Sequence, residues 1–182
     1  MLNQIKINEK VFPLIIKIKP HSRRISLKVS RQKEIVITKP ALLSFGVVED
    51  FVEKNKDWLC RQLQKIESKK EIFIDREEFL KNKDDFFDLI TDKVFYFSKI
   101  LQVQPQKIKI RLGRSRWGSC SRKGILNFNF RLSKLSEEII DYVVVHELCH
   151  LREFNHSKKF WDLVQSVMID YSERRKKLKN YW

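Results

Sequence analysis

The stretch His146-Glu147-Leu148-Cys149-His150 decides how this chain can fold, because it puts two imidazoles and a carboxylate on one short segment. Residues four apart lie on one face of a helix, about 5–6 Å between Cβ atoms, so His146 and His150 can reach one metal ion. Glu147 lies one step round the helix, where its carboxylate can hold the metal's water. A third histidine, His156, follows after five residues, and the chain has only 4 histidines. This pattern is typical of zinc hydrolases.

The residues around the motif predict a buried helix. Ser136 is a candidate N-cap, and residues 139–151 are apolar at most positions. A helix that is apolar all round is a buried one. Histidines and a glutamate inside it are costly unless they are paired or bind a metal. Two core histidines satisfied by backbone carbonyls are the alternative, but they leave His156 unexplained.

The apolar patterns elsewhere predict strands first and helices later. Alternating segments within residues 11–39 predict an N-terminal β-hairpin, and the apolar stripe that follows predicts one helix over 44–67. Further helices are predicted over 76–102, 139–151 and 158–169, and strands over 107–112 and 124–131. Residues 113–123 are expected to form a basic loop, and residues 171–182 a basic tail.

Length and composition predict one folded domain over residues 1–182. The chain has 42% hydrophobic residues, which excludes a disordered protein. We expect an N-terminal β/helix subdomain over 1–70 and a catalytic core over 71–182, with a linker at 68–71. No apolar run approaches a membrane span and no signal-peptide core begins the chain. The 3 cysteines form no close pair, which favours reduced thiols and a cytoplasmic location.

The charge distribution indicates an acidic partner. The net charge is +15, and residues 107–134, directly before the motif helix, carry nine basic residues and no acidic one. Such a field attracts nucleic acid, nucleotides or acidic proteins. A surface charge that serves only solubility is the alternative.

Three sequence blocks in order resemble a known family. The blocks are Arg116-Trp117-Gly118-Ser119-Cys120-Ser121, the segment 141–150 that ends in the motif, and Asn155-His156-Ser157-Lys158-Lys159-Phe160-Trp161. Together they resemble the YgjP-like metal-dependent hydrolases, gluzincin-type zinc peptidases with SprT-like and Wss-like metalloproteases as relatives. The resemblance covers most of the chain.

This resemblance implies an α+β fold with a zincin-like metallopeptidase core, in which a small twisted sheet packs on the H-E-x-x-H helix. It also implies that His146, His150 and His156 are the zinc ligands and that Glu147 is the catalytic acid/base. Metzincins share the histidine spacing, but Glu153 stands where they carry a glycine, so we reject that assignment.

The function that we expect is a zinc-dependent hydrolase, a metallopeptidase that cleaves peptide bonds of a protein or peptide through a metal-activated water. One alternative keeps the zinc but hydrolyses nucleotides or phosphoanhydrides. Another is a nucleic-acid-associated protein with a structural zinc, although structural sites usually have four protein ligands.

Four residues near the motif are candidates for substrate binding. Arg116 and Trp117 could contact substrate, or could pair with an acid and fill the core. Asn127 and Asn129 form a polar face on strand 124–131. In zincins a strand of this kind lies along the cleft edge and pairs with an extended peptide, while a solvent-facing polar face is the alternative.

The second nitrogen of a ligand histidine usually bonds an orienting group. Glu153, Asn155 and Asp162 are the candidates, and the sequence does not rank them.

Overall fold

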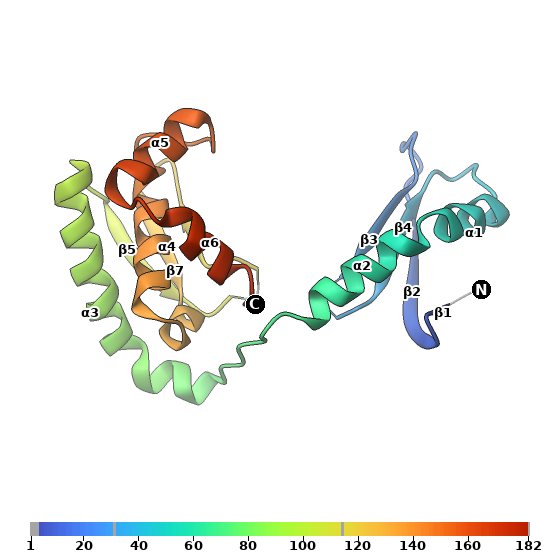
Figure 1. The fold of residues 1–182 in the computed structure, drawn as a ribbon, viewed down its shortest axis with the longest axis horizontal. Helices are drawn as coiled ribbons and strands as arrows, with labels where there is room; N and C mark the ends of the chain where they lie inside the picture. Colours follow the sequence, from blue (N-terminus) through green and yellow to red (C-terminus); the bar gives the residue numbers. More distant parts are fainter. Residues whose placement is uncertain (1–3, 31, 114, 182) are drawn as a thin grey trace. The chain divides into compact units, whose positions relative to one another are not determined.

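A computed structural model describes residues 4–30, 32–113 and 115–181, and it divides the chain into two compact units (Figure 1). The first unit is Met1–Lys69 and the second is Lys70–Trp182, so their boundary falls within residues 68–71. Each unit has a separate cluster of buried apolar side chains.

The first unit is a four-stranded sheet covered on one face by two helices. Its strands are β1 (Gln4–Ile7), β2 (Lys10–Ile18), β3 (Ser26–Val29) and β4 (Ile35–Lys39), in the order β1-β2-β4-β3. The pairs β1–β2 and β3–β4 are antiparallel, and β2–β4 is parallel. Alternation along β4 buries Ile35 and Ile37 completely and leaves Val36 and Thr38 half-buried. The helices α1 (Phe45–Lys54) and α2 (Lys56–Glu67) pack on this buried face.

The prediction of one helix over 44–67 is wrong, because α1 and α2 are separate helices that meet at Asn55. The Asn55 side-chain amide donates to the carbonyl of Phe51 at 2.7 Å, and the Asn55 φ of −107° is not helical. Asparagine competes for backbone carbonyls in this way, which is why it interrupts helices.

The second unit contains a three-stranded sheet in the order β5-β7-β6. β5 (Lys107–Arg111) is parallel to β7 (Ile125–Asn129), and β6 (Gly118–Cys120) is antiparallel to it. The predicted loop 113–123 therefore contains a strand. The predicted strand 124–131 ends early, because Asn129 caps a 3₁₀ turn, η1 (Phe130–Lys134), by accepting from the Arg131 N–H at 3.1 Å.

Four helices complete the second unit: α3 (Arg76–Leu101), α4 (Glu137–Cys149), α5 (Lys158–Val167) and α6 (Tyr171–Leu178). α3 starts where predicted, because the Asp75 carboxylate accepts from the Glu78 N–H at 2.8 Å. α6 lies in the predicted basic tail, so residues 171–178 of that tail are helical. α4 packs against α3, α5, α6 and β6 (Figure 1), and its centre lies inside the apolar cluster. The prediction of an α+β fold is confirmed.

Among the residues that the structure describes, none of the helices is both long enough and apolar enough to cross a membrane.

Candidate active site

The motif lies at the C-terminal end of α4. The side chains of α4 are buried on nearly every face of the helix, and Glu147 is only 5% exposed. Ser136 is at the N-cap position as predicted, although its hydroxyl makes no cap hydrogen bond. The helix ends with His150 as its C-cap residue. The chain then turns and brings His156 back beside the last turn before α5 begins at Lys158.

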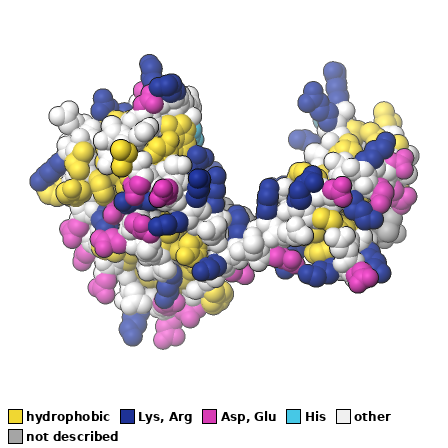
Figure 2. All heavy atoms as spheres, in the orientation of Figure 1, with side chains coloured by type: hydrophobic (Ala, Val, Ile, Leu, Met, Phe, Trp, Pro, Cys, Tyr) yellow, Lys and Arg dark blue, Asp and Glu magenta, His cyan; other side chains and the backbone are white. Residues whose placement is uncertain are grey.

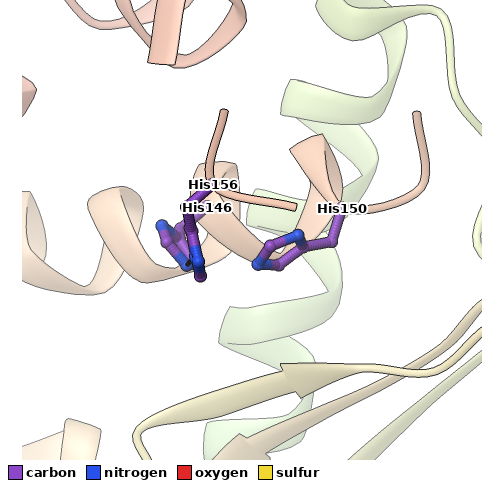
Figure 3. Close-up of side chains that lie close together, drawn as sticks. All are labelled: His146, His150 and His156. Atoms are coloured by element: carbon purple, nitrogen blue, oxygen red, sulfur yellow. Dashed lines mark hydrogen bonds between the residues drawn. The ribbon is translucent and has the colours of Figure 1, made fainter. Parts of the chain in front are cut away.

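Three imidazoles converge at this turn (Figure 3). One nitrogen from each of His146, His150 and His156 lies within 4.8 Å of the other two. The Nε2 atoms of His146 and His156 are 3.0 Å apart. Ligands of a tetrahedral zinc at 2.0–2.1 Å are separated by about 3.3 Å, so this pair is close to that spacing.

The tautomer of His150 suits a metal ligand. Its Nδ1 is 3.0 Å from the carbonyl oxygen of Glu153. A carbonyl only accepts, so the proton is on Nδ1 and the Nε2 lone pair is free to bind a metal. Glu153 was one of three candidates for orienting a ligand, and it contacts the ring through its backbone rather than through its carboxylate. Asp162 instead pairs with Lys158 at 2.8 Å.

The surroundings of His146 and His156 favour their neutral forms. Burial first, then the neighbouring His150 and His156 and the charge of Arg175, lower the pKa of His146 to about 3. Burial, His150 and Arg175 also lower the pKa of His156. Neutral imidazole is the form that binds metal. The buried Nδ1 of His146 has no hydrogen-bond partner among the described residues. The free-energy cost of burying this nitrogen is therefore not offset by a hydrogen bond within the protein. The site therefore fits a metal cation.

Aromatic rings from α5 hold the imidazoles in place. The Phe160 ring is fully buried, and its centroid lies 4.9 Å from that of His146 and 4.6 Å from that of His150. The Trp161 ring stacks on His156, with 5.5 Å between centroids and 21° between planes. Contacts on several sides fix the orientation of these rings, as a preorganised metal site requires.

The carboxylate of Glu147 lies against strand β6. A Cβ built on Gly118 would be 2.6 Å from the Glu147 Oε1, which is closer than real contacts allow, so any larger residue here forces Glu147 or strand β6 to move. The Cys120 N–H donates to the same carboxylate. Burial raises the pKa of Glu147 to about 8, against the lowering effects of Arg116 and of this hydrogen bond. A carboxyl group with a pKa near neutrality can act as a general base and then as a general acid.

Comparison with known proteins identifies the family. The model of the YgjP-like metallopeptidase domain matches residues 83–181, more than half of the chain. The chain belongs to the YgjP-like metallopeptidase family. It is therefore a metal-dependent hydrolase, and the matched region contains α4, β6 and the converging histidines.

Two solved structures are similar to this YgjP-like chain. The metallopeptidase zymogen abylysin of Pyrococcus abyssi shares 26% identity over 49% of this chain and 90% of its own, with a TM-score of 0.46. The zymogen jannalysin of Methanocaldococcus jannaschii shares 24% identity over 49% of this chain and 92% of its own, with a TM-score of 0.45. No curated protein matches the chain.

The prediction that the strand of Asn127 and Asn129 forms the cleft edge is wrong. In this YgjP-like metallopeptidase β7 is the central strand, with β5 on one side and β6 on the other, so its backbone is already paired. Asn129 is buried and donates to the carbonyls of Gly113 and Arg116 at 2.7 and 2.8 Å. Asn127 accepts from the Arg111 guanidinium at 2.9 Å. A substrate contact by either asparagine stays a prediction without support from this geometry.

Arg116 and Trp117 lie immediately before β6. Arg116 is exposed, and its charge acts on the Glu147 carboxyl. Trp117 is half-buried, packs on the core, and has the Arg131 guanidinium 5.7 Å from its ring centroid. Both residues stay candidates for substrate binding, and the structure gives Trp117 a packing role as well.

The basic segment 107–134 is not one free patch. Arg111 bonds Asn127, Arg131 donates to the Ile72 carbonyl at 2.8 Å, and Lys134 pairs with Glu78. Arg114, which belongs to the predicted basic loop, lies outside the described residues. On the face seen in Figure 2, Lys and Arg side chains are spread over both units and mixed with acidic ones. The binding of nucleic acid stays a prediction.

Sequence patterns missed two residues of the site. Gly118 is one, because the need for glycine arises only where β6 meets Glu147. Arg175 on α6 is the other, since a tail rich in lysine and arginine gives no signal for a single arginine. Its guanidinium carbon lies 4.5 Å from the Trp161 ring centroid, within the aromatic group around the histidines.

The buried carboxyl group of Glu147 also predicts a pH dependence of stability. The pKa of a glutamate carboxyl is ordinarily 4.5, and that of Glu147 is about 8 in the fold. Between these values the metal-free folded state keeps a proton on Glu147 that the unfolded chain loses, so the contribution of Glu147 to the free energy of unfolding should fall as pH rises from about 4.5 to about 8. His146, whose pKa is lowered in the fold, contributes in the opposite direction in the lower part of this range. The Glu147→Gln variant should lack the decline due to Glu147. Thermal unfolding of both metal-free proteins at about pH 5 and about pH 8 measures it, and parallel declines would contradict it.

Proposed function

We propose that this metallopeptidase uses zinc, held by His146, His150 and His156, and cleaves peptide bonds with Glu147 as general acid and base. The observation that carries the proposal is the convergence of three imidazole nitrogens within 4.8 Å, beside a buried carboxylate. Histidine nitrogens suit zinc, and three protein ligands with one open position are typical of catalytic rather than structural zinc.

The protein's own groups account for the proton transfers. Bound zinc would polarise the peptide carbonyl and lower the pKa of a water molecule to about 7. Glu147 takes the proton of the attacking water and passes it to the leaving amine. The Cys120 N–H and the close contact with Gly118 hold the Glu147 carboxylate in one orientation during both transfers.

An extended peptide can bind along strand β6. β6 is an edge strand, paired with β7 on one side only. The Cys120 N–H already donates to Glu147, so a peptide that adds to this edge would pair with the remaining backbone groups of β6. Because Glu147 lies against Gly118 and Cys120 of this strand, such a peptide passes the carboxylate. Arg116 and Trp117, at the start of β6, would then contact its side chains.

Two further expectations stay part of this proposal. Residues 1–70 act as an N-terminal subdomain of one YgjP-like domain, and the enzyme is cytoplasmic. The free thiols of Cys60, Cys120 and Cys149 support a reducing compartment.

The zinc site predicts about one zinc per chain in protein purified without chelator. His156→Ala should lower zinc affinity by at least about 100-fold, beyond the effect of losing an orienting group, because it removes a direct ligand. His21→Ala is the matched control, since His21 is the fourth histidine and lies in the first unit. Elemental analysis and competition with a chromophoric chelator measure both. Less than about a tenth of an equivalent, with no uptake of added zinc, would contradict the proposal.

Hydrolysis is tested with a mixed panel of unfolded proteins, peptides and nucleotides. The zinc-loaded protein should cleave peptide bonds, a chelator should stop cleavage, and added zinc should restore it. Cleavage of nucleotides alone would replace the peptidase with the phosphoanhydride hydrolase.

A further inference from the structure

Arg175 contacts a side chain, Trp161, that itself contacts one of the converging histidines. Its guanidinium lies 4.5 Å from the Trp161 ring centroid. The same Trp161 ring stacks on Tyr171, at 5.5 Å and 16°, and on His156, at 5.5 Å and 21°. The helix α6 therefore brings a cation to the ring that supports a proposed metal ligand.

The charge of Arg175 has no ion-pair partner among the described residues, unlike those of Arg174 and Lys177. Arg174 bonds the Asp170 carboxylate at 2.8 Å, and Lys177 bonds that of Glu138 at 2.8 Å. Arg175 is exposed and has no ion pair within the part of the chain that the structure describes. Its guanidinium nevertheless contacts the Trp161 ring that stacks on His156.

A packing role alone does not account for this position. A cation over an exposed aromatic ring contributes only about 0.5–1 kcal/mol. Three neutral imidazoles do not neutralise a bound divalent metal. The nearby Arg175 guanidinium would therefore repel the metal, because both are positively charged. An anionic group that binds between the metal and the Arg175 guanidinium is attracted to both. A negatively charged ligand therefore suits this position.

We propose that Arg175 binds a carboxylate of the peptide substrate beside the scissile bond, so that the enzyme prefers Asp, Glu or a free C-terminus there. This inference rests on the proposed peptidase function. The planar guanidinium matches a carboxylate with two parallel hydrogen bonds. The guanidinium contacts the Trp161 ring, and that ring stacks on His156, so we expect Arg175 to meet a side group of the peptide rather than the reacting carbonyl. The net charge of +15 favours the approach of acidic peptides.

The test uses peptides that differ only by Glu, Gln or Lys on either side of the cleaved bond. The wild-type enzyme should favour Glu over Gln by about 10-fold in kcat/KM at one of the two positions, the size expected for one charge-assisted pair. Arg175→Gln should bring that ratio close to 1, and Arg175→Glu should make Lys the preferred residue. Lys176→Gln removes the adjacent exposed charge of α6 and should keep the wild-type ratio.

Binding gives a readout that needs no turnover. In a zinc-loaded Glu147→Gln background, tryptophan fluorescence should report tighter binding of the Glu peptide than of the Gln peptide by about the same factor. Arg175→Gln in this background should abolish the difference. If the wild-type and Arg175→Gln proteins prefer Glu over Gln equally, the inference is overturned. Loss of this preference in Lys176→Gln would overturn it as well. Neither result would count against peptide cleavage. Binding of nucleoside triphosphates with no response to the peptides would overturn the inference too, whereas a failure to cleave any peptide would count against the proposed function.

Discussion

Glu147→Gln should keep its metal and lose peptide hydrolysis by roughly 10²- to 10⁴-fold, the usual contribution of a general acid or base. The amide has nearly the shape of the carboxyl group, so it fits the same space against Gly118 and still accepts from the Cys120 N–H. It cannot take up a proton, however, and the attacking water loses its base. Metal content and kcat for a cleaved peptide measure the two effects separately.

Glu138→Gln is the matched control for this loss. Glu138 lies in the first turn of the same helix and pairs with Lys177 at the surface, so removal of its charge should change activity by less than about 2-fold. Wild-type activity in Glu147→Gln would place the chemistry elsewhere. Loss of metal together with activity would make Glu147 part of the metal-binding group instead.

Helices that are determined by local sequence signals could be predicted. α3 has an Asp75 cap, a 3.6-residue apolar repeat and Pro105 beyond its end, and α4 is apolar on nearly every side. β6 could not be predicted, because Gly118–Cys120 is a short segment of small residues that becomes a strand only by pairing with β7. The break at Asn55 depends on one side-chain hydrogen bond to Phe51, which the apolar stripe does not reveal.

The same distinction holds within the site. The convergence of His146, His150 and His156 follows from spacing, since one helical turn carries two of them and a short loop returns the third. The partners of Glu147 and Trp161 come from distant segments: Gly118 lies in β6, and Arg175 lies in α6. Contacts of this kind are set by tertiary packing, and a pattern of charges or small residues does not encode them locally.

Gly118→Ala should reduce activity by about 100-fold without removing any reactive group. The new Cβ would lie 2.6, 2.7 and 2.9 Å from Oε1, Cγ and Cδ of Glu147, so the carboxylate or strand β6 must move. A displacement of about 1 Å at a catalytic group costs on the order of 10²-fold. Metal content should stay at the wild-type level, because none of the three histidines contacts Gly118 among the interactions described. Measured kcat and zinc content test both statements.

Gly113→Ala is the control with the same chemical change. Its Cβ would meet only the Asn129 side chain at 3.7 Å, an ordinary contact, so activity should stay within about 2-fold of wild type. A double-mutant cycle shows whether the effect passes through Glu147: in a Glu147→Ala background, where the clashing atoms are gone, Gly118→Ala should no longer lower the thermal unfolding midpoint. Equal destabilisation in both backgrounds would mean that Gly118 serves the backbone of β6 alone. Wild-type activity in Gly118→Ala would mean that Glu147 works from a position away from this strand.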